Sequence, residues 1–135
     1  MSTAAEHLKQ IAAGEITSVE LTQQYLDRIT ARDAQIGAFL RVEADTALAC
    51  AADVDRRRRA GLPVGALGGL PVAVKDVLCD HTTLTTCASR MLENFRAPYD
   101  ATVVAKLKAA DAVFLGRTNM DEFAMGGSTE NSAFQ

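Results

Sequence analysis

Residues 67–76, with the sequence LGGLPVAVKD, constrain the fold more than any other stretch of this chain. After the two glycines, residues 72–74 place small or β-branched side chains on both faces of a short strand, which is typical of a strand buried on both sides. Pro71 fits at the start of such a strand, because no ladder hydrogen bond is lost there. The sequence therefore predicts a buried strand that ends at Lys75.

Lys75 is the first candidate for a catalytic group. Burial lowers the pKa of a lysine, and the neutral amine that results is a base. Asp76 follows directly, but side chains alternate across a strand, so its carboxylate should point away from the amine. The alternative is a lysine at a strand end that extends its ammonium group into solvent.

The rest of the chain alternates helix and strand patterns, which predicts an α/β architecture. Capping-box pairs, in which a residue with a short polar side chain precedes a glutamate by three positions, mark three helix starts: Thr3 with Glu6, Thr17 with Glu20, and Asn119 with Glu122. Helices are expected up to about residue 14, from 17 to about 32, from 44 to 60, from 89 to 94, after Asp100 (which could cap that helix) and from about 119. Strands are expected at 39–42, 71–75 and 112–116.

Composition excludes several classes of function. The 135 residues suffice for one domain, and no window approaches the 18 apolar residues of a membrane span. The N-terminus shows no secretion signal, and the three cysteines lack metal spacing. We therefore expect a cytoplasmic protein with reduced thiols that does not contact a membrane. The net charge of −3 argues against binding nucleic acid by this chain alone, and we interpret the arginine run 56–59 as a solvated helix end.

Two other sets of side chains could carry chemistry, but their patterns are weaker. Cys87 with His81 could form a nucleophile and base, yet no third residue orients the histidine. Asp121 and Glu122 could be paired acids, but adjacent residues on a helix do not face each other. Glu122 fits better as a helix-capping residue.

Glycine loops and metal ligands give little further signal. A phosphate site at Gly65, Gly68 and Gly69 matches no phosphate-binding motif, and the two histidines, His7 and His81, are isolated from other metal ligands in the sequence. No metal site is therefore expected. The tail loop that begins at Gly126 could present backbone groups to a small polar ligand, although an ordinary glycine turn explains it better.

Several motifs together resemble the amidase signature enzymes. The matching segments are residues 69–76, 85–94, 99–104, 116–126 and 128–134. Together, and most specifically in the run from 119 to 134, these segments resemble the A subunits of glutamyl-tRNA(Gln)/aspartyl-tRNA(Asn) amidotransferases. The resemblance implies the N-terminal part of the amidase signature fold, a mixed β-sheet covered by helices and incomplete in this chain.

The resemblance also implies a reaction and a role for Lys75. In the family, a lysine at this position deprotonates a bridging serine, which activates a nucleophilic serine against the side-chain amide of glutamine. Met125 and Gly126 match main-chain positions that line the glutamine pocket. The ammonia passes to other subunits of the complex, which bind ATP and Mg²⁺ and most of the mischarged tRNA. This chain itself would bind no cofactor.

The sequence also departs from the family pattern. In the family, the glycine- and serine-rich signature that supplies both serines comes shortly after the motif matched at residues 131–134, and it is not among residues 1–135. Asp111 replaces a glycine that is usual between helix and strand. We therefore expect residues 1–135 to be the N-terminal portion of a single amidase domain, inactive by itself. A small-molecule amide hydrolase of the same superfamily and a non-catalytic assembly module are the alternative interpretations.

Overall fold

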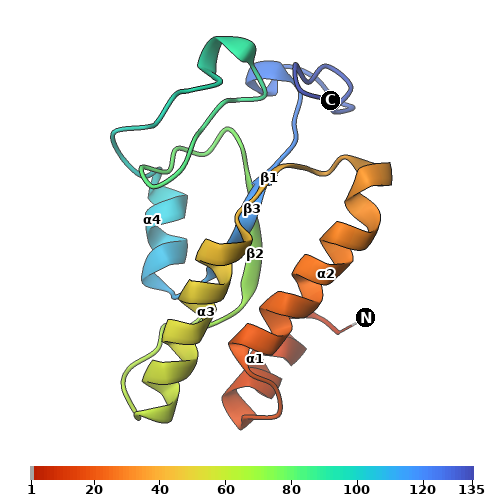
Figure 1. The fold of residues 1–135 in the computed structure, drawn as a ribbon. Helices are drawn as coiled ribbons and strands as arrows, with labels where there is room; N and C mark the ends of the chain where they lie inside the picture. Colours follow the sequence, from red (N-terminus) through yellow and green to blue (C-terminus); the bar gives the residue numbers. More distant parts are fainter. Residues whose placement is uncertain (1) are drawn as a thin grey trace.

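A three-stranded sheet forms the centre of the computed structural model, which describes residues 2–135 (Figure 1). Its order is β1-β3-β2, and β3 pairs antiparallel with β1 and parallel with β2. The strands are β1 (Phe39–Val42), β2 (Pro71–Lys75) and β3 (Val113–Thr118). The predicted mixed α/β sheet is confirmed, and all three strands lie where the sequence placed them, except that β3 begins one residue later and ends two residues later than predicted.

Four α-helices and two short 3₁₀ helices accompany the sheet. They are α1 (Ala4–Ala13), α2 (Ser18–Ile36), α3 (Ala44–Arg59), η1 (Arg90–Leu92), α4 (Thr102–Ala109) and η2 (Glu122–Ala124). Capping boxes are present at the starts of α1 and α2, as predicted. Helix α2 runs four residues beyond its predicted end, until Gly37 adopts a left-handed conformation and closes it. Within residues 2–135, no helix has both the length and the apolar character needed to cross a bilayer.

Two other predicted capping residues are wrong, although a helix follows each of them. Asp100 makes no capping bond to α4, because its carboxylate accepts hydrogen bonds from His81 and Lys108 instead. At η2, the N-cap position is held by Asp121 rather than Asn119, and no side chain caps the helix. On α4 itself, Val104 is buried but Val103 is 44% exposed, so Val103 does not belong to the inner face.

The main apolar cluster joins α2 and α3 to the central strand. It comprises Leu26, Ala47, Ala51, Val113 and Leu115. Along β2, Val74 is buried whereas Ala73 and Lys75 are exposed. The prediction that β2 is covered on both faces is therefore wrong at this end of the strand, because nothing among the described residues covers the Ala73 and Lys75 side.

Asp111 organises the loop before β2. It adopts the left-handed conformation with φ 61°, as expected for a residue in place of glycine. Its carboxylate accepts a hydrogen bond from the Gly65 N–H at 2.6 Å, and its carbonyl accepts one from the Gly69 N–H at 2.9 Å. The Gly68 N–H donates to the Gly65 carbonyl. All three glycine N–H groups are thus engaged within the protein, which contradicts a phosphate site there.

Two arginines of the run at the end of α3 bind the same loop. Arg57 forms an ion pair with Asp111 at 2.6 Å, and Arg58 donates to the Gly68 carbonyl at 3.2 Å. The interpretation of residues 56–59 as a merely solvated helix end is therefore wrong for these two side chains. The hydrogen bond from Arg57 is the main reason why the pKa of Asp111 lies below its usual value.

Candidate active site

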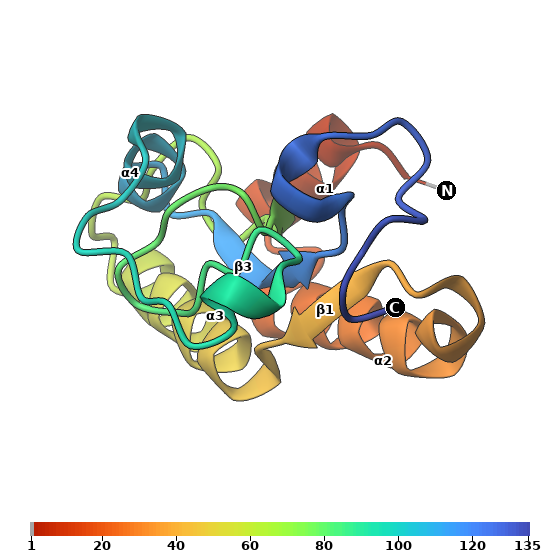
Figure 2. The same cartoon turned by 90° about the horizontal axis from the view of Figure 1, so that it is seen from above.

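The candidate site lies at the edge of the sheet where the parallel strands β2 and β3 both end. Lys75, the last residue of β2, is paired in register with Thr118, the last residue of β3. Segments 84–96 and 119–135 lie beyond this end of the sheet, and Figure 2 shows them from above, over the strands. Ligands of open α/β sheets bind at this edge, because the loops that follow the carboxyl ends of the strands converge there.

Lys75 and Asp76 point in opposite directions, as predicted. The Lys75 side chain is exposed, and within residues 2–135 its amine has no hydrogen bond or ion pair. The Asp76 carboxylate is fully buried and bound elsewhere. The expectation of a desolvated Lys75 is thus not met by the described residues, although the amine is free of any carboxylate partner among them.

Asp76 connects β1 with the segment that follows β2. One carboxylate oxygen accepts a hydrogen bond from Arg41 Nη2 at 2.6 Å. The other accepts from the N–H of Thr86 at 3.0 Å, from the Thr86 hydroxyl, and from the N–H of Ala88 at 3.5 Å. The buried carboxylate therefore fixes the path of residues 86–88 directly beside Lys75.

Arg117 supplies a second positive charge to this buried region. Only 1% of the residue is exposed, and its Nε lies 3.5 Å from the Asp76 carboxylate. Its guanidinium also donates to the Leu78 carbonyl and the Thr85 hydroxyl, and approaches Asp80 at 3.9 Å. A buried charge is tolerated when it is paired and hydrogen-bonded, and here each charge has both.

Backbone hydrogen bonds connect residues 87–88 to the C-terminal segment. The Cys87 N–H donates to the Asp76 carbonyl at 3.2 Å, and the Cys87 carbonyl accepts from the Phe123 N–H at 2.9 Å. The Ala133 N–H donates to the Ala88 carbonyl at 3.0 Å. Left-handed conformations at residues other than glycine gather here, at Cys87, Ala88, Phe123, Ala124 and Thr129. Such strained backbone is found at functional sites more often than elsewhere.

A second carboxylate, Asp121, organises the loop that contains Met125 and Gly126. It accepts hydrogen bonds from the N–H groups of Ser128, Thr129 and Asn131 at 3.0–3.2 Å. The bonds from Thr129 and Asn131 are the main reason why the pKa of Asp121 lies below its usual value. Met125 is 76% exposed, and Gly126 is exposed beside it. The structure thus places both residues on the segment that lies over the edge where Lys75 ends β2.

The cysteine candidate is contradicted by the structure. Burial, and then the negative charge of Asp76, raise the pKa of the Cys87 thiol, which disfavours the thiolate needed of a nucleophile. The histidine considered as its base, His81, is engaged elsewhere: its Nδ1 lies 2.8 Å from Asp100 Oδ1, in the segment before α4. The three cysteines are free, as expected.

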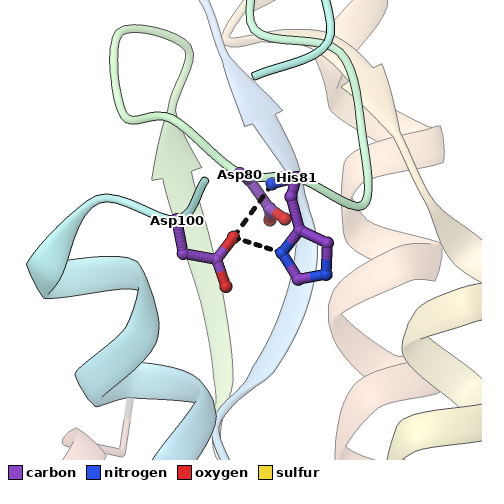
Figure 3. A group of neighbouring side chains, drawn as sticks. All are labelled: Asp80, His81 and Asp100. Atoms are coloured by element: carbon purple, nitrogen blue, oxygen red, sulfur yellow. Dashed lines mark hydrogen bonds and ion pairs between the residues drawn. The ribbon is translucent and has the colours of Figure 1, made fainter. Parts of the chain in front are cut away.

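One group of side chains has the composition of a metal site, contrary to the expectation that His81 is isolated. Asp80, His81 and Asp100 lie together (Figure 3), and their ligand atoms are within 4.8 Å of one another. The ammonium of Lys108 lies 2.7 Å from Asp80 Oδ1 and 3.0 Å from Asp100 Oδ2. It already occupies the position between the carboxylates that a cation would take, so we interpret the group as an ion-pair network anchoring α4.

A cavity of about 520 Å³ lies away from this edge, between α3 and the start of β3. Its apolar wall includes Val54, Val113 and Phe114, and its charged side chains Arg57 and Lys108 are paired with carboxylates of the protein. Lys75, Met125 and Gly126 do not line it. The cavity is therefore separate from the candidate site.

The matches to known proteins agree with the arrangement. The family model described as Amidase matches residues 20–135. The chain is 55% identical over 133 residues to the A subunit of the glutamyl-tRNA(Gln) amidotransferase from Rhodopirellula baltica, a match that covers 98% of this chain and 27% of that protein. The corresponding protein of Thermosynechococcus vestitus is 52% identical and is covered to 28%. The chain thus spans little more than a quarter of the length of these relatives.

Solved structures show the same fold. The native peptide amidase of Stenotrophomonas maltophilia superposes with a TM-score of 0.83 at 39% identity, over 90% of this chain and 25% of that one. The A subunit of the glutamyl-tRNA(Gln) amidotransferase from Thermotoga maritima superposes with a TM-score of 0.72 at 37% identity, over 98% of this chain and 26% of that one.

Proposed function

Because the chain belongs to the Amidase family, we propose that it is the N-terminal part of the A subunit of a glutamine-hydrolysing amidotransferase, in which Lys75 is the general base. The observation that carries this proposal is the position of Lys75. It ends β2 at the edge where the ligand-facing loops converge, and its amine has no carboxylate partner among residues 2–135. An unpaired amine can lose its proton once its surroundings become apolar, whereas an ion-paired one is held charged.

In the proposed reaction, Lys75 takes a proton from the bridging serine, which in turn takes one from the nucleophilic serine. The serine oxygen forms a bond to the amide carbon of glutamine, and the carbon–nitrogen bond then breaks. The leaving nitrogen takes this proton back from Lys75 through the bridging serine and departs as ammonia, and water hydrolyses the remaining ester. We place both serines outside residues 1–135, so this chain would contribute the base and part of the pocket. Residues 1–135 alone would not hydrolyse glutamine.

The proposed pocket includes the main chain of Met125 and Gly126, which would face the glutamine side chain. Glycine suits this position because the backbone can approach a ligand closely. The ammonia would pass to other subunits of a cytoplasmic complex, where ATP and Mg²⁺ activate the acyl group of a mischarged tRNA. We assign no cofactor and no membrane contact to this chain.

A second candidate is an amide hydrolase that needs no partner protein. The likeness to the peptide amidase favours it, because that superposition has a higher TM-score than the one with the Thermotoga protein. The 55% identity to a component of an amidotransferase favours the first candidate. Lys75 would have the same role in both.

An assay of ammonia release by the full-length protein decides between them. The amidotransferase proposal predicts hydrolysis of glutamine that increases when the partner subunits, ATP and mischarged tRNA are added. Efficient hydrolysis of peptide or small aryl amides by the protein alone, with no response to partner subunits, would favour the hydrolase. Purified residues 1–135 serve as the control and should release no ammonia.

A further inference from the structure

The carboxylate of Asp121 is surrounded by donors from a single loop. The residue is only 6% exposed, and its Oδ2 accepts from the N–H groups of Ser128 at 3.2 Å and Thr129 at 3.0 Å. Its Oδ1 accepts from the N–H of Asn131 at 3.1 Å and from Asn131 Nδ2 at 3.3 Å. The N–H groups of Ser128 and Thr129 have no other acceptor among the described residues.

Gly126 lies against the other side of the same carboxylate. A Cβ added at Gly126 would lie 2.5 Å from Asp121 Oδ2, closer than real contacts allow. A Cβ added to the next residue, Gly127, would meet no atom within 4 Å. The carboxylate therefore lies inside the curve of the loop, in contact with Gly126 and bonded to residues 128–131.

Asp121 also lies where this loop joins the rest of the site. The Ala124 N–H donates to the Asp121 carbonyl at 2.8 Å, and the Glu122 N–H donates to the Asn131 carbonyl at 3.1 Å, which closes the loop at its base. Phe123 and Ala124, directly before Met125, have positive φ angles of 53° and 60°. Residues in this conformation are strained and persist only where surrounding contacts hold them.

We infer that Asp121 is a positioning residue, which fixes the main chain of Met125 and Gly126 so that the pocket accepts an amide substrate. The inference rests on the proposed function. Asp121 does not touch the reacting atoms in this role, because its carboxylate is turned into the loop. Its removal should therefore weaken substrate binding more than it slows the chemical step that Lys75 serves.

Asp121→Asn in the full-length protein tests the inference. Asparagine keeps the shape but has one acceptor oxygen, so either the 128–129 pair or Asn131 loses its partner. Loss of a hydrogen bond to a charged group changes an equilibrium constant roughly tenfold or more. We therefore expect KM for glutamine to rise about tenfold, while kcat changes less than about twofold. Hydrogen exchange of residues 125–131 should accelerate by a similar factor. Asp27→Asn, which removes the same charge from an exposed position on α2, is the control and should change neither quantity.

A pair of glycine variants provides an independent measurement should Asp121→Asn fold poorly. Gly126→Ala should displace the carboxylate and accelerate exchange at 128–131, whereas Gly127→Ala should leave that exchange unchanged. Equal exchange in both glycine variants, or a fall in kcat with unchanged KM in Asp121→Asn, would overturn the inference. If the wild-type protein does not hydrolyse glutamine, the proposed function fails, and the exchange measurements still decide whether Asp121 positions the loop.

Discussion

Replacing Asp76 by asparagine removes the negative charge that faces two arginines at the edge of the sheet. Arg117 is almost fully buried and would keep only Asp80, whose carboxylate is 3.9 Å away, as a counter-ion. Breaking a buried ion pair by removing one partner typically costs about 3–5 kcal/mol. Arg41 can turn to solvent because its side chain is partly exposed, so we expect the lower end of this range, about 3 kcal/mol.

Hydrogen exchange of the full-length protein measures this loss locally. The N–H groups of Thr86 and Ala88 donate to the Asp76 carboxylate, so their exchange reports on opening of the segment. A loss of about 3 kcal/mol corresponds to exchange roughly 100-fold faster in Asp76→Asn. Asp45→Asn, a change of the same charge at an exposed position on α3, should leave these rates unchanged.

A double variant separates the ion pair from other effects of the substitution. Replacing both charges, in Asp76→Asn with Arg117→Met, leaves no uncompensated charge between these two residues. The double variant should therefore be destabilised by less than the sum of the two single variants. Two results would contradict a buried ion pair between Asp76 and Arg117. One is exchange of the Thr86 and Ala88 N–H groups within about threefold of wild type in Asp76→Asn, and the other is strictly additive destabilisation in the double variant.

Two further predictions concern acid stability and independent folding. Burial alone would raise the pKa of Asp80 and Asp100, but hydrogen bonds, including those from Lys108, lower both pKa values. The contribution of these two carboxylates to folding stability is therefore complete above about pH 4 and is lost as pH falls further. Lys108→Met should therefore move the acid unfolding midpoint, followed by circular dichroism, to higher pH. Purified residues 1–135 should retain helix signal but show little cooperative thermal unfolding, because each exposed large apolar side chain forfeits roughly 1.5–3 kcal/mol of burial. A sharp, reversible transition would contradict this and support the assembly module.

The sequence predicted those parts of the fold that depend on neighbouring residues. Capping boxes at Thr3 and Thr17 lie within four residues of their partners, and they fixed the starts of α1 and α2. Alternation along β2 correctly separated Lys75 from Asp76. The same local spacing failed at Asp100, because a carboxylate that can cap a helix bound His81, which is 19 positions away.

The parts of the site that the sequence did not reveal depend on distant partners. Asp76 meets Arg41 across 35 positions and Arg117 across 41, and no local pattern indicates those pairs. The sequence pattern presents Asp121 only as one of two adjacent acids, although the polar, glycine-containing loop after it contains N–H groups that can bind its carboxylate. The exposure of Lys75 agrees with the alternative of a lysine that extends into solvent and not with a buried base, because an apolar strand pattern does not tell whether the covering layer lies within residues 2–135.

Ammonia release from glutamine by a Lys75→Arg variant of the full-length protein tests the central claim most directly. Arginine keeps the positive charge but cannot give up a proton near neutral pH, so it cannot act as a base. We expect glutamine hydrolysis to be abolished, while hydrogen exchange of residues 84–88 stays at the wild-type level. A Lys75→Arg protein that releases ammonia at a near-normal rate would show that Lys75 is only a solvated residue at the end of a strand.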